Sequence, residues 1–258
     1  MHLPFHTRYL AGGLTAFALT LSLPAAGAIV PFNENFDNAV DANNDGTPDD
    51  FSISSGYTLN NTTGTYDYLR TATFGSTRVS SVELTNAVSQ PSITISSDFT
   101  VDDDNGSIGL GAFGDTSAFA GSVYLLDVNV DGSTSDLRII RLAGSSIDPS
   151  GPTVITPIAF GFDDSLPFSL SATLADNNVS GLDISLTVTQ GSDSFTINAV
   201  DPTPLTGEYF GYRLRVNGSG SGLTISGTAD NFSVVPEPGT MALAGLGAAG
   251  IGLRRRRA

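Results

Sequence analysis

The chain has 258 residues, a formal net charge of −15 at pH 7 and no cysteine. Six arginines and 25 acidic residues lie between Ile29 and Val235, so this central body carries a formal charge of −19. Such a surface repels nucleic acid phosphates and anionic lipid head groups, which excludes both as expected partners. The body has no cysteine, lysine or histidine, which excludes disulfides, Ser-His-Asp triads, cysteine nucleophiles, His-ligated zinc and lysine Schiff bases.

The first 28 residues have the three parts of a secretory signal peptide. A head that carries Arg8 precedes an apolar run of about 14 residues, Leu10–Leu23. This run is shorter than the roughly 20 residues that span a bilayer. Small residues at Ala26 and Ala28 fit the pattern that signal peptidase requires, so we expect cleavage after Ala28. A signal helix over 1–28 is therefore expected in the precursor and absent from the mature protein.

An acidic segment at residues 41–50 is a candidate calcium loop. Oxygen-bearing side chains occupy every second position before a glycine, which lets a tight loop wrap a hard cation. The twelfth position, which supplies a bidentate glutamate in an EF-type loop, is Ser52. The segment resembles the loops of dockerins and thrombospondin type 3 repeats, which implies Ca²⁺ as a cofactor; a solvated acidic loop is the alternative. The candidate ligands are Asp41, Asn43, Asp45, Thr47 and Asp49.

Alternating apolar and polar residues dominate the rest of the body, which is typical of half-buried strands. The clearest runs cover 168–174, 182–188 and 212–216, and Asp-Gly, Asn-Asn, Gly-Ser and Asn-Gly pairs mark turns between runs. Many short antiparallel strands at this spacing predict one domain of two packed sheets. Further runs occur around 93–95, 99–101, 124–130, 137–142, 195–197, 223–225 and 232–234.

Two other acidic stretches have simpler interpretations than metal binding. Asp127, Asn129 and Asp131 repeat the oxygen spacing, but valines stand between them and continue the alternation of the preceding run. This pattern favours a strand that enters an Asp-Gly hairpin turn. The stretch 102–106 is likewise predicted to be a solvated turn.

Paired carboxylates are the catalytic device that remains available, and glycoside hydrolysis needs only two. The three glutamates of the body, Glu34, Glu83 and Glu208, are widely separated, and no aspartate pair stands out. We therefore expect no enzyme. Aromatic rings that stack on sugars would instead form a binding face, although a buried core is their commoner position. The candidate rings are Tyr57, Tyr66, Tyr68, Phe113, Phe119, Tyr209 and Tyr212.

The last 24 residues form a second terminal signal. The prolines of Val235-Pro236-Glu237-Pro238 lack amide donors, so this stretch is expected to interrupt regular structure. Residues 239–253 form a short apolar segment, expected to be helical, and the four arginines at 254–257 remain on the cytoplasmic side of a membrane. The body would then face outward, with the membrane contacted only transiently through 239–253.

This order of features resembles the PEP-CTERM sorting signal of Gram-negative bacteria. The resemblance implies that an exosortase recognises Pro236, Glu237 and Pro238, removes the tail, and releases or transfers the body to the cell surface or extracellular matrix. It concerns the destination of the protein and implies nothing about its activity.

The body resembles the concanavalin A-like, laminin-G-like jelly roll. The stretches that carry this resemblance are 32–37 and 229–234 at its ends, with 122–127 and 209–215 between them. The resemblance implies that the first and last strands pair. We therefore predict a signal peptide at 1–28, an all-β, two-sheet antiparallel jelly-roll sandwich at 29–234, and a sorting segment at 235–258.

The sequence thus predicts an exported cell-surface or extracellular-matrix protein whose β-sandwich has a structural or adhesive role and is a candidate for calcium stabilisation. A carbohydrate-binding, lectin-like module is the alternative, and a polysaccharide-degrading enzyme is less favoured. The expected partners are signal peptidase and exosortase during export, with extracellular polysaccharide as a candidate ligand.

Overall fold

The computed structural model describes residues 31–37, 48, 51, 53–72, 77–85, 87–130, 135–144, 146–217 and 222–237. Within these ranges the regular elements are β-strands, apart from one short 3-10 helix, η1 (Ala87–Ser89). No helix of this described part is long and apolar enough to cross a membrane. The two predicted terminal helices and the cleavage residues Ala26 and Ala28 lie outside it.

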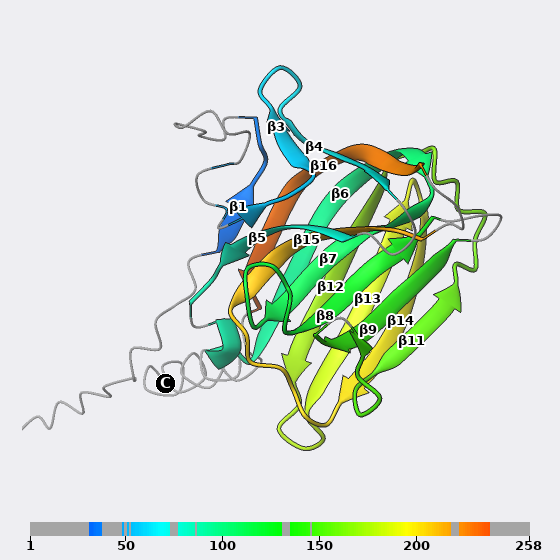
Figure 1. The fold of residues 1–258 in the computed structure, drawn as a ribbon. Helices are drawn as coiled ribbons and strands as arrows, with labels where there is room; N and C mark the ends of the chain where they lie inside the picture. The colour runs from blue at the N-terminus through cyan, green and yellow to red at the C-terminus, as the bar shows by residue number, and fades with distance from the viewer. Residues whose placement is uncertain are drawn as a thin grey trace, which may run out of the picture.

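The strands form two antiparallel sheets, which we call sheet A and sheet B (Figure 1). Sheet A has the order β14-β13-β12-β6-β16-β4-β3, with β1 also paired to β16. Its strands are β1 (Phe32–Glu34), β3 (Tyr57–Asn60), β4 (Thr65–Ala72), β6 (Ser92–Asp104), β12 (Phe168–Asp176), β13 (Leu182–Gln190), β14 (Asp193–Asp201) and β16 (Leu223–Pro236).

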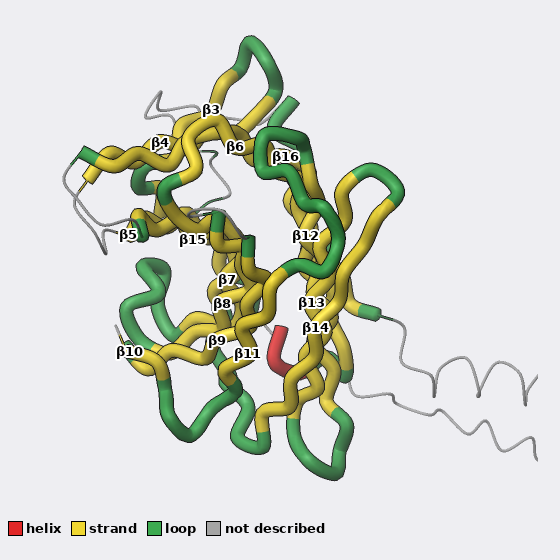
Figure 2. The backbone as a smooth tube through the Cα atoms, turned by 90° about the vertical axis from the view of Figure 1, so that its right-hand side faces the viewer, coloured by secondary structure: helices red, strands yellow, loops and turns green. Residues whose placement is uncertain are grey.

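Sheet B has the order β10-β9-β8-β7-β15-β5-β2, with β11 also paired to β9. The turned view in Figure 2 separates the two layers, with β7–β9 in one and β12–β14 in the other. The predicted two-sheet antiparallel sandwich is confirmed. The strands of sheet B are β2 (Ile53–Ser54), β5 (Thr77–Glu83), β7 (Gly106–Gly114), β8 (Ser122–Asn129), β9 (Asp136–Ala143), β10 (Ser146–Ile147), β11 (Thr153–Pro157) and β15 (Tyr209–Val216).

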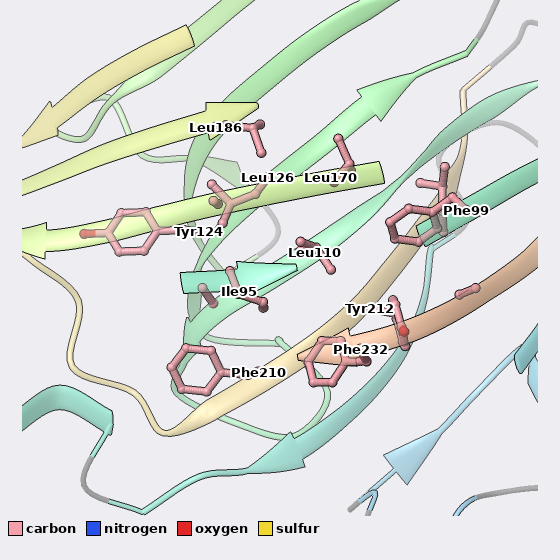
Figure 3. Packing of buried hydrophobic residues seen from close by; sticks show 14 of the residues in the cluster. Ile95, Phe99, Leu110, Tyr124, Leu126, Leu170, Leu186, Phe210, Tyr212 and Phe232 are labelled. Atoms are coloured by element: carbon pink, nitrogen blue, oxygen red, sulfur yellow. The ribbon is translucent and has the colours of Figure 1, made fainter. Parts of the chain in front are cut away.

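The alternation in the sequence becomes the inner faces of the two sheets. Along β12 and β13, every second residue is buried and its neighbours are half-buried or exposed. Successive side chains of a strand point to opposite faces, so each apolar set faces the opposing sheet. Figure 3 shows residues of both sheets meeting there, among them Leu110 and Leu126 of sheet B and Leu170 and Leu186 of sheet A.

The first and last strands of the body pair, as the jelly-roll resemblance implies. Phe32 stands opposite Val234 and Glu34 opposite Phe232. Strand β16 lies inside sheet A, with β6 along one side and with β4 and then β1 along the other. The two ends of the described body are therefore neighbours in one sheet.

For the two acidic stretches at 127–131 and 102–106, the structure agrees with the prediction to different extents. Asp127 and Asn129 lie in β8, which confirms the predicted strand, whereas Asp131 is outside the described residues. The prediction of a turn at 102–106 is wrong for four of its five residues, because Asp102–Asp104 end β6 and Gly106 begins β7. Asp103 and Asp104 pair with β16, so the ladder extends the strand while the three side chains stay exposed.

Aromatic side chains fill the centre of the sandwich around Tyr212. Its ring lies 5.0 Å from that of Phe232 and 5.8 Å from that of Phe99, centroid to centroid. The Tyr212 hydroxyl lies 2.9 Å from Ser97 Oγ, and the Tyr68 hydroxyl donates to the carbonyl of Thr100 at 2.6 Å. The buried phenols of Tyr68 and Tyr212 are thus hydrogen-bonded, which offsets part of the cost of removing them from water.

These phenols predict an alkaline limit to stability. Burial raises the pKa of Tyr57, Tyr68 and Tyr212 well above the ordinary value of 10.0. Because the folded-state pKa exceeds the unfolded one, their stabilising contribution is complete below about pH 10 and is lost as the pH rises further. We expect one cooperative transition above about pH 10, in which phenolate absorbance and loss of the β circular dichroism signal coincide.

The chain has no lysine, so no lysine amine titrates in the same pH range as the phenols. Tyr209, which is half-buried and lies outside the main core, serves as the internal reference, because its ionisation does not require the core to open. Ionisation of the buried tyrosines with an unchanged circular dichroism spectrum would contradict this prediction.

Candidate functional site

A pocket of about 370 Å³ lies on the outer face of sheet B. On β15, Phe210, Tyr212 and Leu214 point into the core, so Arg213 and Arg215 between them point outward. Strands β8 and β9 supply the remainder of the floor, and residues 118–120 of the β7–β8 loop stand at its side. A volume of this size falls within the ~300–1,000 Å³ range of small-molecule sites.

The part of the floor that β8 and β9 supply is largely apolar, with Leu125, Ile140 and Leu142 beside Arg138. A cluster separate from the main core contains Val79, Phe119, Val123, Leu125 and Ile140, all buried. Strand β8 is consequently buried on both of its faces, which is unusual for a sandwich strand whose outer face meets water. The outer surface of sheet B is therefore partly covered rather than fully solvated.

The β7–β8 loop supplies this cover. Phe119 folds back onto the sheet, where a Cβ on either Gly111 or Gly114 would overlap its ring. Several hydrogen bonds hold the loop. Among them, the amide of Phe119 donates to the carbonyl of Thr116 at 2.9 Å, and Ser81 Oγ donates to the carbonyl of Ser117 at 2.6 Å. Glycines on β7 therefore make the space that positions the ring.

A buried ion cluster lies beside this floor. Asp127, 1% exposed, accepts from Arg138 Nε through Oδ1 at 2.7 Å, and its Oδ2 lies 3.5 Å from Arg213 Nη1. In the register, Arg213 on β15 stands opposite Gly109 on β7, and Gly109 stands opposite Asp127 on β8. Since Gly109 has no side chain, Arg213 reaches across β7 to Asp127.

The cluster leaves an excess of positive charge at the pocket. Arg138, Arg213 and Arg215 are the charged side chains in that part of its wall which the structure describes. Burial lowers the pKa of Arg213 to about 10; Asp127 opposes that change, whereas the charges of Arg215 and Arg138 reinforce it. A buried guanidinium in this position gains from any additional anion.

The predicted calcium ligands Asp41, Asn43, Asp45, Thr47 and Asp49 lie outside the described residues, so calcium binding there stays a prediction. Elsewhere the described residues contain no group of three or more His, Cys, Asp or Glu side chains placed to hold a metal ion.

Two residues of the predicted sorting motif lie at the end of the sandwich. Pro236 is the last residue of β16 and stands opposite Ile93. The amide of Glu237 donates to the carbonyl of Ser92 at 2.9 Å. The expectation that the stretch 235–238 interrupts regular structure holds in that β16 ends within it, although Pro236 itself is still part of the strand, because a strand terminus tolerates a residue that lacks an amide donor. Pro238 lies outside the described residues.

Most of the proposed sugar-stacking rings are buried instead. Tyr57, Tyr66, Tyr68, Phe113 and Tyr212 belong to the main core, and buried Phe119 belongs to the cluster under the pocket. Tyr209 is half-buried. The faces of the buried rings are occupied by protein, which corrects the idea of an aromatic platform.

Sequence reasoning missed the arginine-lined pocket. The usable signal was Arg213 and Arg215 at alternate positions of one strand, in a body with six arginines and no lysine. The partners Asp127 and Arg138 come from other strands and depend on the register. No spacing in the sequence joins these four residues.

Comparisons with known proteins agree on the tail and the fold. Residues 234–257 match the PEP-CTERM protein-sorting motif. The structure is similar to a legume lectin-like domain from Entamoeba histolytica, with a TM-score of 0.52 and 10% identity over 73% of this chain and 91% of that one. No curated protein sequence matches.

Two further solved structures have the same architecture. Lectin II from Ulex europaeus has a TM-score of 0.51 and 14% identity over 80% of this chain and 97% of that one. A variant of the alginate lyase Aly36B in complex with an alginate tetrasaccharide has a TM-score of 0.51 and 11% identity, with the same shares. At these identities the similarity concerns the fold, a lectin-like jelly-roll sandwich. Both predicted resemblances are confirmed.

Proposed function

We propose that this exported protein, which bears a PEP-CTERM sorting motif on a lectin-like sandwich, is an adhesive component of the cell surface or extracellular matrix that binds polysaccharide. Its export and C-terminal processing follow from the motif, which implies recognition by an exosortase. The proposal concerns what the body does at its destination.

The observation that carries the proposal is the pocket on sheet B. It combines an apolar floor with a few charged groups, the composition typical of sites for small ligands and sugar units. The similar folds include lectins and a lyase crystallised with a saccharide, which supports saccharide as the class of ligand.

Binding is favoured over turnover by the chemistry of the wall. Hydrolysis of a glycosidic bond uses two carboxylates that flank it. The described wall of the pocket presents guanidinium groups, apolar side chains and the hydroxyl of Thr77, and contributes no carboxylate. A structural and adhesive role therefore needs only the groups already assembled there.

Saccharide binding can be tested with the processed protein on a glycan array and by titration calorimetry. Ile147, 51% exposed, lines the pocket, and Ile147→Ala should weaken binding about threefold to tenfold through lost apolar contact. The matched control is Leu69→Ala, since Leu69 is 60% exposed on β4 of the other sheet. Equal losses in both variants would contradict binding at this pocket. Shortening of the polysaccharide chains would contradict a non-catalytic role.

Calcium binding by residues 41–49 is a separate prediction. A ligand that binds only the folded state stabilises it by about 2.7 kcal/mol at 100 times its dissociation constant, which raises Tm by roughly 5–10 °C here. Asp45→Ala should remove this rise. Asp131→Ala, in the similar stretch assigned to a hairpin, should retain it. No rise in the parent protein would disprove the calcium site.

A further inference from the structure

We propose that the pocket on sheet B selects acidic saccharides, and that the guanidinium groups of Arg138, Arg213 and Arg215 take the carboxylate of a uronic acid unit. This inference rests on the proposed saccharide binding and names the class of sugar.

The distribution of charge is the first argument. The body between Ile29 and Val235 has 25 acidic residues and six arginines, yet three of those arginines line one pocket. No acidic side chain of the described residues lines it with them. A neutral sugar would gain hydrogen bonds but no charge attraction from this arrangement, whereas a carboxylate would also meet a local excess of positive charge within an otherwise repelling surface.

The hydrogen-bonding capacity is the second argument. A guanidinium has five N–H donors, and among the bonds between described residues Arg138 uses Nε and Arg213 uses Nη1, both toward Asp127. The other N–H groups of the two side chains have no acceptor within the described residues. Because both side chains are largely desolvated, a carboxylate placed on them would form short, charge-assisted hydrogen bonds.

The apolar floor is the third argument. Leu125, Ile140 and Leu142 line the pocket together with the arginines. A uronic acid unit presents a planar carboxylate at one end of a ring whose faces carry C–H groups. Guanidinium groups match the carboxylate in two-point geometry, and the aliphatic side chains can pack against the ring face. A small inorganic anion would use only the first of these features.

The test compares a sugar acid with its neutral ester. Short oligomers of galacturonate, mannuronate and guluronate, and the same oligomers after methyl esterification, are titrated into the processed protein by calorimetry. EDTA is present so that calcium cannot bridge carboxylates. We expect at least one acid oligomer to bind and its ester to bind at least tenfold more weakly, a difference of about 1.4 kcal/mol.

Substitutions of arginine test whether the selectivity for the acid oligomer arises at this pocket. Arg215→Gln should weaken binding of the acid oligomer at least about tenfold, and binding of the ester by a smaller factor. Arg138→Gln provides a second pocket variant, whose Tm is measured alongside because Arg138 also pairs with buried Asp127. Arg70→Gln, on β4 of sheet A, removes the same charge away from the pocket and should change the affinity less than about twofold.

The outcomes separate this inference from the proposed function. Equal binding of acid and ester, or binding of neutral saccharides alone, would overturn the selectivity while the saccharide site remains. Acid binding that Arg215→Gln and Arg138→Gln leave unchanged would also overturn it. A protein that binds neither acidic nor neutral saccharides would overturn both proposals.

Discussion

Asp127→Asn is expected to lower the free energy of unfolding by about 3–5 kcal/mol, because it removes the negative charge from a buried carboxylate that is paired with two arginines. Asparagine keeps the shape of the side chain, so packing around β8 is preserved. What remains is the cost of holding Arg138 and Arg213 largely out of water without a counter-ion. Urea-induced unfolding, followed by circular dichroism, measures the difference.

Asp136→Asn is the matched control for that measurement. Asp136 is half-buried on β9, two residues before Arg138 and on the same face, and has no ion pair within the described residues. Its replacement should cost less than about 1 kcal/mol. Adding Arg213→Gln to Asp127→Asn should recover part of the loss, because it removes one of the uncompensated charges. A loss below about 1 kcal/mol for Asp127→Asn would show that the cluster is hydrated.

Tyr212→Ala is expected to cost about 3–5 kcal/mol, the range for removing a large aromatic ring from a core. The ring is fully buried on β15 of sheet B and lies against rings of the opposing sheet A, so the surrounding strands cannot close the cavity without moving the layers. Tyr212→Phe keeps the ring and loses only the hydrogen bond to Ser97, for which we expect about 1 kcal/mol. Equilibrium unfolding in denaturant compares the two variants.

Tyr209→Ala controls for the loss of a tyrosine from the same strand. Tyr209 lies on the outward face of β15 and is half-buried, so its removal leaves the core intact. The expected cost is below about 1.5 kcal/mol. A similar loss for Tyr209→Ala and Tyr212→Ala would contradict the position of Tyr212 at the centre of the sandwich.

Local patterns were sufficient for much of the fold. The alternation at 168–174, 182–188 and 212–216 predicted strands, and β12, β13 and β15 occupy these stretches. The pairing of β1 with β16 came from the jelly-roll resemblance, because no local rule joins strands that stand at opposite ends of a chain. At Pro236 the local rule was one residue early, since β16 ends there but the ladder with β6 still includes the proline as its last residue.

The candidate site was beyond the reach of such patterns. Arg213 and Asp127 meet because Gly109, on a third strand, leaves the space between them empty. A glycine within a strand sequence does not indicate which two side chains will meet across it. That depends on the register of β15, β7 and β8. The prediction that aromatic rings bind sugar was wrong for a different reason. The hydrophobic ring surface that suits a sugar is equally favoured in a core, and the sequence does not distinguish the two positions.

The position of β16 has a mechanical consequence. A body held by its C-terminal end would be loaded along this strand, whose neighbours β6, β4 and β1 are bonded to it on both sides. Ladder hydrogen bonds of antiparallel strands run perpendicular to the strands, and here that means across the direction of pull. Under such shear the ladder hydrogen bonds of β16 would bear the force together and break together, rather than break one after another. The strand that leads to the sorting signal is thus also the one best placed to bear tension between the body and whatever holds it.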